Sequence, residues 1–175
     1  MTLLDRVLRI LGEANVPHAL IGAAALAANG VARSTFDLDL LAVDFRCLDE
    51  SLWAALRAHD ATVEIRRGDA DDPLLGIVRC EAPGERPVDV VVGRHAWQSR
   101  ALSRAVRSGA GPPIVGPLDL VLLKLYAGGP QDLWDIRQLL DASDRPALSA
   151  QVDNEVGQLD AEARRLWITV RDSDR

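Results

Sequence analysis

Two apolar runs of strand-forming residues carry carboxylates, and they constrain the fold more than any other feature of the sequence. FDLDLLAV (36–43) holds Asp37 and Asp39, and PVDVVVG (87–93) holds Asp89 among valines. Side chains alternate along a strand, so Asp37 and Asp39 share one face, roughly 7 Å apart. Aspartate is depleted from strands, and a buried carboxylate without a partner is costly. The sequence therefore predicts a sheet whose carboxylates have a partner of opposite charge.

Two kinds of partner remain open for these carboxylates. A hard divalent cation such as Mg²⁺ prefers oxygen ligands and relieves the repulsion between like charges. Alternatively, Asp37 and Asp39 line a solvent-facing strand, and Asp89 forms a buried ion pair with Arg79 or Arg86. If 87–93 pairs beside 36–41, all three carboxylates converge. Such a trio suits two Mg²⁺ ions and a nucleoside triphosphate.

Hydrophobic periodicity places these strands in a chain that mixes helices and strands. Helices are predicted over 2–14, 23–30, 46–59, 95–107, 117–127, 130–142 and 148–170. Strands are predicted over 18–21, 36–43, 61–67, 74–82 and 87–93. We therefore expect an α+β, two-layer fold: a mixed β-sheet with helices packed on it in residues 1–115, followed by a C-terminal helical region in residues 116–175.

Composition and charge narrow the functional classes. The net charge of −6 argues against a protein that coats nucleic acid, although a local basic groove remains compatible with it. No apolar run reaches the roughly 18 residues of a membrane span, and the N-terminal MTLLDRVLRI is amphipathic rather than a signal peptide. The two cysteines form no metal-binding pattern, so we expect reduced thiols in a cytoplasmic protein that does not enter membranes.

Two further features point to phosphate binding. Gly22 lies where a strand turns into a helix, and free backbone amides at such a turn attract phosphate; relief of helix–sheet packing is the alternative reason for a glycine. Lys124 is the only lysine among 20 basic residues, and it interrupts an apolar helix. It either reaches a partner that arginine would not suit or ends as a solvated tip.

Taken together, these motifs resemble the core of DNA polymerase β-type nucleotidyltransferases. The shared pattern is Gly22–Ala23, a spacer of 13 residues, Asp37–Leu38–Asp39–Leu40 and the distal Asp89. GVARSTFDLDLL is similar to small bacterial nucleotidyltransferases that include toxins of type IV toxin–antitoxin systems. Lys124, followed eight residues later by Asp132, resembles a lysine–aspartate segment of these proteins. The resemblance spans roughly residues 18 to 140. Ala23 replaces a usual Gly or Ser, and Gly129 replaces a residue that is often basic.

The resemblance implies a Mg²⁺-dependent nucleotidyltransferase that moves a nucleoside monophosphate from a triphosphate such as ATP to a hydroxyl group. The implied metal ligands are Asp37, Asp39 and Asp89, which form the catalytic set with Lys124. The implied nucleotide-binding residues are Gly22, Ala23, Arg33, Ser34, Lys124 and Asp132, with Asp132 orienting Lys124 or Arg33. Two Mg²⁺ ions are expected, with Mn²⁺ as a substitute.

The resemblance leaves the acceptor and the partners open. The acceptor is the 3′ end of tRNA, a protein side chain or a small molecule, and a cognate antitoxin is an expected partner of a toxin. The alternative reading is a non-catalytic nucleotide-binding or antitoxin-like module on the same fold, although the intact carboxylates and Lys124 weigh against it.

Overall fold

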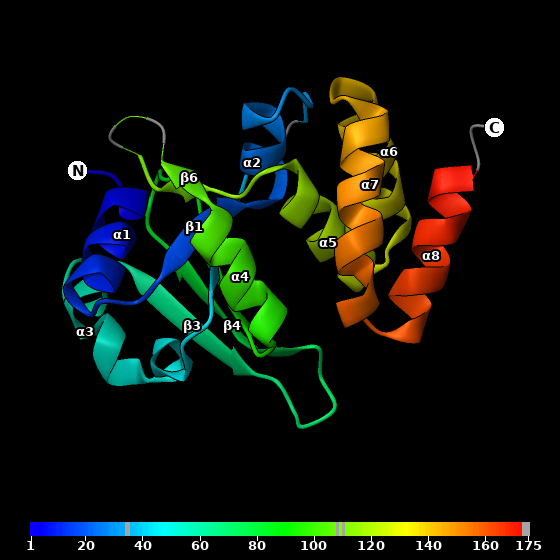
Figure 1. Cartoon of the computed structure of the whole chain (residues 1–175). Coiled ribbons are helices and arrows are strands. Elements are labelled where there is room, and N and C mark those ends of the chain that lie inside the picture. Colours follow the sequence, from blue (N-terminus) through cyan, green and yellow to red (C-terminus); the bar gives the residue numbers. More distant parts are fainter. Residues whose placement is uncertain (34–35, 108, 110, 173–175) are drawn as a thin grey trace.

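The computed structural model describes residues 1–33, 36–107, 109 and 111–172. A mixed seven-stranded sheet with the strand order β3-β4-β5-β2-β1-β7-β6 forms its centre (Figure 1). The strands are β1 (His18–Ile21), β2 (Leu38–Ala42), β3 (Thr62–Arg67), β4 (Leu74–Glu81), β5 (Val88–Gly93), β6 (Val106–Arg107) and β7 (Pro113–Ile114). A mixed sheet with helices packed on it and a C-terminal helical region confirm the predicted fold class. The helices cover both faces of the sheet.

Helices and 3₁₀ turns connect and cover the strands. They are α1 (Leu3–Glu13), α2 (Gly22–Ala28), η1 (Phe45–Leu48), η2 (Glu50–Trp53), α3 (Ala54–Arg57), α4 (Ala96–Arg104), α5 (Pro117–Ala127), α6 (Pro130–Ala142), α7 (Arg145–Glu155), η3 (Val156–Gln158) and α8 (Ala161–Asp172). In Figure 1, α5 to α8 gather at one side of the molecule and α1 and α3 lie at the other. Among the described helices, none is both long and apolar enough to cross a membrane.

Sheet register brings the predicted carboxylates together. Strand β2 pairs antiparallel with β1 and parallel with β5, and Asp39 lies directly opposite Asp89. Strand β4 pairs antiparallel with β5 and places Arg79 on the other side of Asp89. A single row across the sheet therefore contains Arg79, Asp89, Asp39 and, on β1, Ile21.

Alternation along β2 and β5 divides the interior into two cores. Leu40 and Val90 face a cluster formed with α1, η1 and α3. Leu41 and Val91, one residue further along each strand, face the second cluster, which includes α2 and α5 to α8. Asp39 is two residues from Leu41, so it lies on the second face. The candidate site therefore opens between the sheet and the C-terminal helices.

Two of the predicted long helices are wrong. Residues 46–59 form two 3₁₀ turns and the short α3, because the side chains of Asp44 and Asp49 accept hydrogen bonds from the backbone amides of Arg46 and Ser51. Residues 148–170 contain a break between α7 and α8, where Asp160 Oδ1 accepts from the amide of Ala163 at 2.8 Å. These short polar side chains start new turns inside runs that look helical by periodicity.

Other predicted boundaries also shift. The helix predicted over 95–107 ends at Arg104, and Val106–Arg107 instead joins the sheet as β6 beside β7. The strand predicted over 36–43 begins at Leu38, which leaves Asp37 just before β2. This matters for the site, because Asp37 is held by side-chain contacts and not by the sheet ladder.

Candidate functional site

The three predicted carboxylates meet where β2 and β5 begin. Asp39 and Asp89 are register partners on adjacent strands. Arg79 Nη1 donates to Asp89 Oδ2 at 2.9 Å and to Asp37 Oδ2 at 3.3 Å, while Arg79 Nε donates to Glu81 Oε1 at 2.7 Å. The ion pair between Asp89 and Arg79, which the sequence left as an alternative to metal binding, is therefore present and extends to Asp37.

The local electrostatics disfavour ionisation of two of these groups. Burial raises the pKa of Asp39 above its ordinary value, the charges of Asp89 and Asp37 raise it further, and Lys124 and Arg33 oppose the rise. Burial also raises the pKa of Asp89, against the opposing effect of Arg79. The surroundings of both carboxyl groups therefore favour the protonated form more than water does, mainly because of burial.

Gly22 permits the close approach of Asp39 to the start of α2. Its φ of +64° lies in the left-handed region, and a Cβ atom on this residue would be 2.0 Å from Asp39 Oδ2. Any other residue would displace the carboxylate. Ala23, the next residue, is buried in α2. The glycine thus has a steric role toward Asp39 that neither reading of the sequence anticipated.

The sole lysine lies in a network of charges between α5 and α6. Lys124 Nζ is 2.8 Å from both Asp132 Oδ1 and Asp135 Oδ2. Asp135 also accepts a hydrogen bond from Arg33 and is completely buried. Asp132 is thus in contact with Lys124, whereas Asp135 holds both Lys124 and Arg33. Sequence reasoning missed Asp135 as a site residue, although it lies three residues after Asp132 and so shares its helix face.

One cavity connects the carboxylate and lysine ends of this site. Its volume is about 420 Å³, and Gly22, Asp39, Lys124 and Asp132 contribute to its lining. The remaining wall is mostly apolar and includes Ile21, Leu41, Val91, Leu120 and Leu123. A cavity of this size and character is within the range of small-molecule sites, about 300–1,000 Å³.

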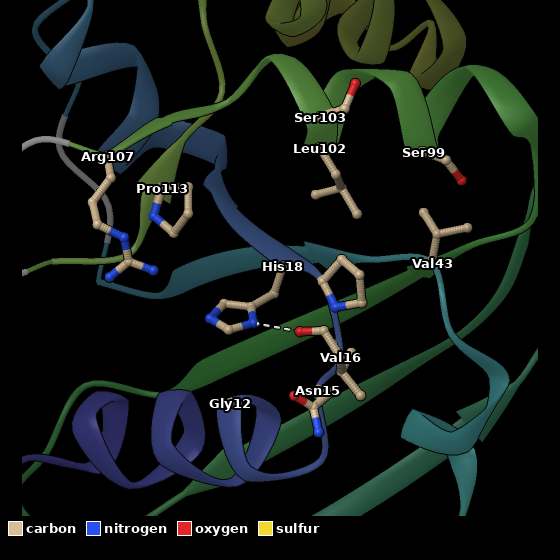
Figure 2. Close-up of a pocket in the computed structure, with 11 residues that line it drawn as sticks. Gly12, Asn15, Val16, His18, Val43, Ser99, Leu102, Ser103, Arg107 and Pro113 are labelled. Carbon is tan, nitrogen blue, oxygen red and sulfur yellow. Dashed lines mark hydrogen bonds between the residues drawn. The ribbon is translucent and has the colours of Figure 1, made fainter.

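A second and larger hollow, of about 560 Å³, lies at the opposite end of β1. Figure 2 shows residues of the α1–β1 turn, α4 and β6 around it, with His18 Nδ1 donating to the carbonyl oxygen of Val16 at 2.8 Å. None of the described residues that line it is acidic. We therefore place the candidate chemistry in the smaller cavity, beside Asp39.

The carboxylates suit a divalent cation chemically, although they are not arranged as a ready metal centre. Within the described residues, no group of three or more His, Cys, Asp or Glu side chains is positioned to hold a metal ion. However, Asp89 Oδ1 is buried and has no hydrogen-bond partner among the described atoms. An oxygen in this state, next to Asp39, fits a hard cation.

Other predicted contacts are placed as follows. Ser34 lies outside the described residues. The arginines of α4, which could have lined a track for RNA, contact the protein itself. Arg104 pairs with the buried Asp119, with 3.0 Å between Nε and Oδ2, and Arg100 donates to Gln158. The charge of Arg104 is therefore paired, whereas Arg100 keeps its charge because Gln158 is neutral.

Comparison with known proteins gives likeness in structure alone. No protein-family model and no curated protein sequence matches the chain. A solution structure of the antibiotic-resistance factor ANT(2'')-Ia is 16% identical with a TM-score of 0.55, covering 89% of this chain and 90% of that one. A crystal structure of ANT(2'')-Ia in complex with adenylyl-2''-tobramycin is 17% identical with a TM-score of 0.54, covering 99% and 97%. The chain therefore has a nucleotidyltransferase-like fold over nearly its whole length.

Proposed function

We propose that this protein is a Mg²⁺-dependent nucleotidyltransferase that transfers a nucleoside monophosphate from a nucleoside triphosphate to a hydroxyl group. The observation that carries this proposal is the convergence of Asp37 and Asp89 on Asp39, which lines one cavity together with Gly22 and Lys124, on a nucleotidyltransferase-like fold.

Each charged group has a role that follows from its surroundings. Asp37, Asp39 and Asp89 would hold Mg²⁺, which supplies Lewis-acid activation of the hydroxyl and stabilises the leaving oxygens. Lys124, which lines the cavity, and Arg33, which shares Asp135 with it, would neutralise the triphosphate. The apolar wall of the cavity would limit the access of water to the reacting phosphate.

The transfer itself needs one proton acceptor. The hydroxyl oxygen bonds to the α-phosphorus, the bond from that phosphorus to the bridging oxygen breaks, and pyrophosphate leaves with the electron pair. We assign this role to Asp89, which would also help to hold the cation that activates the hydroxyl.

A small-molecule hydroxyl is the acceptor class that we favour over tRNA or a protein. The adenylylated product in the ANT(2'')-Ia complex, adenylyl-2''-tobramycin, is a small molecule. The net charge of −6 disfavours RNA binding, and the ion pair of Arg104 with Asp119 removes one cation of α4 from contact with a phosphate backbone. A toxin that modifies tRNA and pairs with a cognate antitoxin is the alternative, and it requires a basic surface elsewhere.

A non-catalytic nucleotide-binding module is the second candidate. The observation that favours it is Arg79, whose guanidinium occupies carboxylate oxygens that metal ions would otherwise use. In this reading, the protein binds a nucleoside triphosphate through Lys124 and Arg33 and performs no transfer.

A transfer assay separates these candidates. The protein is incubated with Mg²⁺ and each α-³²P-labelled nucleoside triphosphate, in the presence of tRNA, protein or aminoglycoside acceptors. We expect label on one acceptor class, abolished by Asp39→Ala and retained by Asp141→Ala, which changes an exposed carboxylate of α6. Tight triphosphate binding without transfer under any of these conditions would establish the module instead.

A further inference from the structure

Arg79 is held among the carboxylates by the backbone as well as by its ion pairs. The β4–β5 ladder places it directly opposite Asp89, and the β3–β4 ladder places Glu64 on its other side. Its Nε is fixed by Glu81 at 2.7 Å. Because sheet register sets its Cα position, Arg79 cannot leave this row without a change in strand pairing.

The contacts of Arg79 divide the carboxylate oxygens into two sets. Nη1 alone bonds to Oδ2 of Asp89 at 2.9 Å and to Oδ2 of Asp37 at 3.3 Å. The buried Oδ1 of Asp89 has no partner among the described atoms, and Asp39 lies on the side of Asp89 away from Arg79. Arg79 thus already binds one oxygen of Asp89 and one of Asp37, whereas Asp39, which lines the cavity, is not among its partners.

Three other cations lie near the trio. Lys124 bonds to Asp132 and Asp135, Arg33 bonds to Asp135, and Arg86 donates to the backbone carbonyl oxygens of Phe36 and Asp37. Arg79 instead bonds to the carboxylate oxygens of two proposed metal ligands. A guanidinium and a metal ion cannot share the same carboxylate oxygen at bonding distance without strong repulsion.

We propose that Arg79 takes the place of one of the two metal ions expected at this site, so that the protein binds a single divalent cation. Asp39 and the unpartnered Oδ1 of Asp89 would hold that ion. Arg79 supplies the positive charge on the other side of Asp89. This inference rests on the proposed function, because it concerns the metal content of that same site.

The number of ions can be read from the electron paramagnetic resonance spectrum of bound Mn²⁺, in the presence of a non-hydrolysable nucleoside triphosphate analogue. Two Mn²⁺ ions about 3.5–4 Å apart couple magnetically, whereas a single ion gives an isolated spectrum. We expect one uncoupled Mn²⁺ per wild-type chain. Arg79→Met should bind two and show the coupled spectrum, and Arg79→Lys, which keeps the charge, should bind one.

The matched control is Arg66→Met, because Arg66 is an exposed arginine of β3 that pairs with Glu64 and contacts none of the three aspartates. It should keep the wild-type spectrum. A coupled pair of Mn²⁺ ions in the wild-type protein overturns the inference. So does a single bound Mn²⁺ in Arg79→Met, provided that this variant has the melting temperature of the wild type. The number of Mn²⁺ ions bound to the wild-type protein is measured without any variant. It therefore decides the question even where Arg79→Met does not fold.

Failure of the proposed function has a different signature. If the wild-type protein binds no Mn²⁺ beyond that held by the free analogue, and Asp39→Asn does not change the spectrum, then the metal-dependent activity fails together with this inference. If Mn²⁺ binds as a coupled pair that Asp39→Asn removes, the proposed function stands and only the role of Arg79 is lost.

Discussion

The contact between Gly22 and Asp39 ties a backbone conformation to the chemistry of the site. With φ at +64° and only 2.0 Å between a hypothetical Cβ and Asp39 Oδ2, Gly22→Ala must move the carboxylate. We expect this variant to weaken Mn²⁺ binding by at least about tenfold, since an ångström of displacement can cost far more in a catalytic site. Isothermal titration of Mn²⁺ in the presence of a triphosphate analogue measures the effect.

Gly12→Ala is the matched control for this glycine. Gly12 lies inside α1, and its Cβ would have no neighbour within 4 Å. Alanine there should leave Mn²⁺ binding unchanged and stabilise the protein by about 0.5–1 kcal/mol. Unchanged Mn²⁺ binding by Gly22→Ala would show that the site tolerates a shifted Asp39.

The raised pKa of Asp39 predicts a conflict between stability and function. A carboxyl group whose pKa is higher in the folded state than its ordinary value of 3.8 destabilises the fold once the pH exceeds both values. In EDTA at pH 7, Asp39→Asn should therefore melt above the wild type. The difference should shrink as the pH falls through the raised folded-state pKa, and it should vanish well below 3.8, where the wild-type group is protonated in both states.

Mg²⁺ should make the wild-type protein more stable than Asp39→Asn, which reverses the order of stability expected in EDTA. Binding to the folded state alone stabilises a protein by mass action, and Asp39→Asn loses that gain. Saturating Mg²⁺ and a triphosphate analogue should raise the midpoint of the wild-type thermal melt and leave the midpoint of the variant unchanged. An Asp39→Asn protein that is less stable than wild type in EDTA would mean that the ionised group is well accommodated.

At this scale, the sequence identifies the acids but not all of their contacts. Asp39 and Asp89 can be singled out because carboxylates are rare in strands, and Lys124 because it is the only lysine. The pairing of Arg79 with Asp37 could not be derived, because it depends on the register of three strands. Asp135 was overlooked because an acid near the start of a helix already has a local explanation.

The turn between α5 and α6 is the element that assembles the cationic end of the site. Gly128 ends α5 with φ at +69°, and Pro130 begins α6, so Asp132 and Asp135 face back toward Lys124. The Gly128–Gly129–Pro130 break is clear in the sequence. Its consequence, a completely buried Asp135 between two cations, follows only from the packing of the two helices.

Asp135→Asn should therefore be more harmful than Asp132→Asn. Asp135 is completely buried and holds Arg33 and Lys124, so its loss leaves poorly compensated charge and should cost about 3 kcal/mol. The Asp132 side chain is 20% exposed, and its neutralisation should cost about 1 kcal/mol. Urea unfolding measures both values, with Asp141→Asn on the exposed side of α6 as a control. Equal costs for Asp132 and Asp135 would contradict the network described here.

Elements with strong periodicity were predictable, while those governed by a single polar side chain were not. The helices over 117–127 and 130–142 match α5 and α6 because apolar residues repeat across their whole length. The helix expected over 46–59 failed because Asp44 and Asp49 each cap a separate turn. Strand β6 was missed because two residues carry no periodicity, and its pairing with β7 is decided by the fold.

At the scale of the whole molecule, the sheet and the C-terminal helices share one core. The sequence suggested a boundary between residues 115 and 116, yet one buried cluster contains Ile21 and Leu41 of the sheet together with Leu122, Ile136 and Trp167 of the helices. Trp53 lies in the other cluster, on the opposite face. Because β2 contributes Leu40 to one cluster and Leu41 to the other, loss of either core should disrupt the same strand.

We therefore expect the protein to unfold as one cooperative unit. The four tryptophans allow a direct test by ¹⁹F NMR after incorporation of 5-fluorotryptophan, with each resonance assigned from a Trp→Phe variant. The native signals of Trp53 and Trp167, one in each core, should disappear at the same urea concentration. Trp167→Ala removes a side chain that is 2% exposed and donates to Asp153, so it should cost about 3–5 kcal/mol and shift the Trp53 transition by the same amount. If Trp167 melted first and Trp53 kept its wild-type midpoint, the C-terminal helices would be a separate domain, and the cavity beside Asp39 would lie at an interface that can open independently.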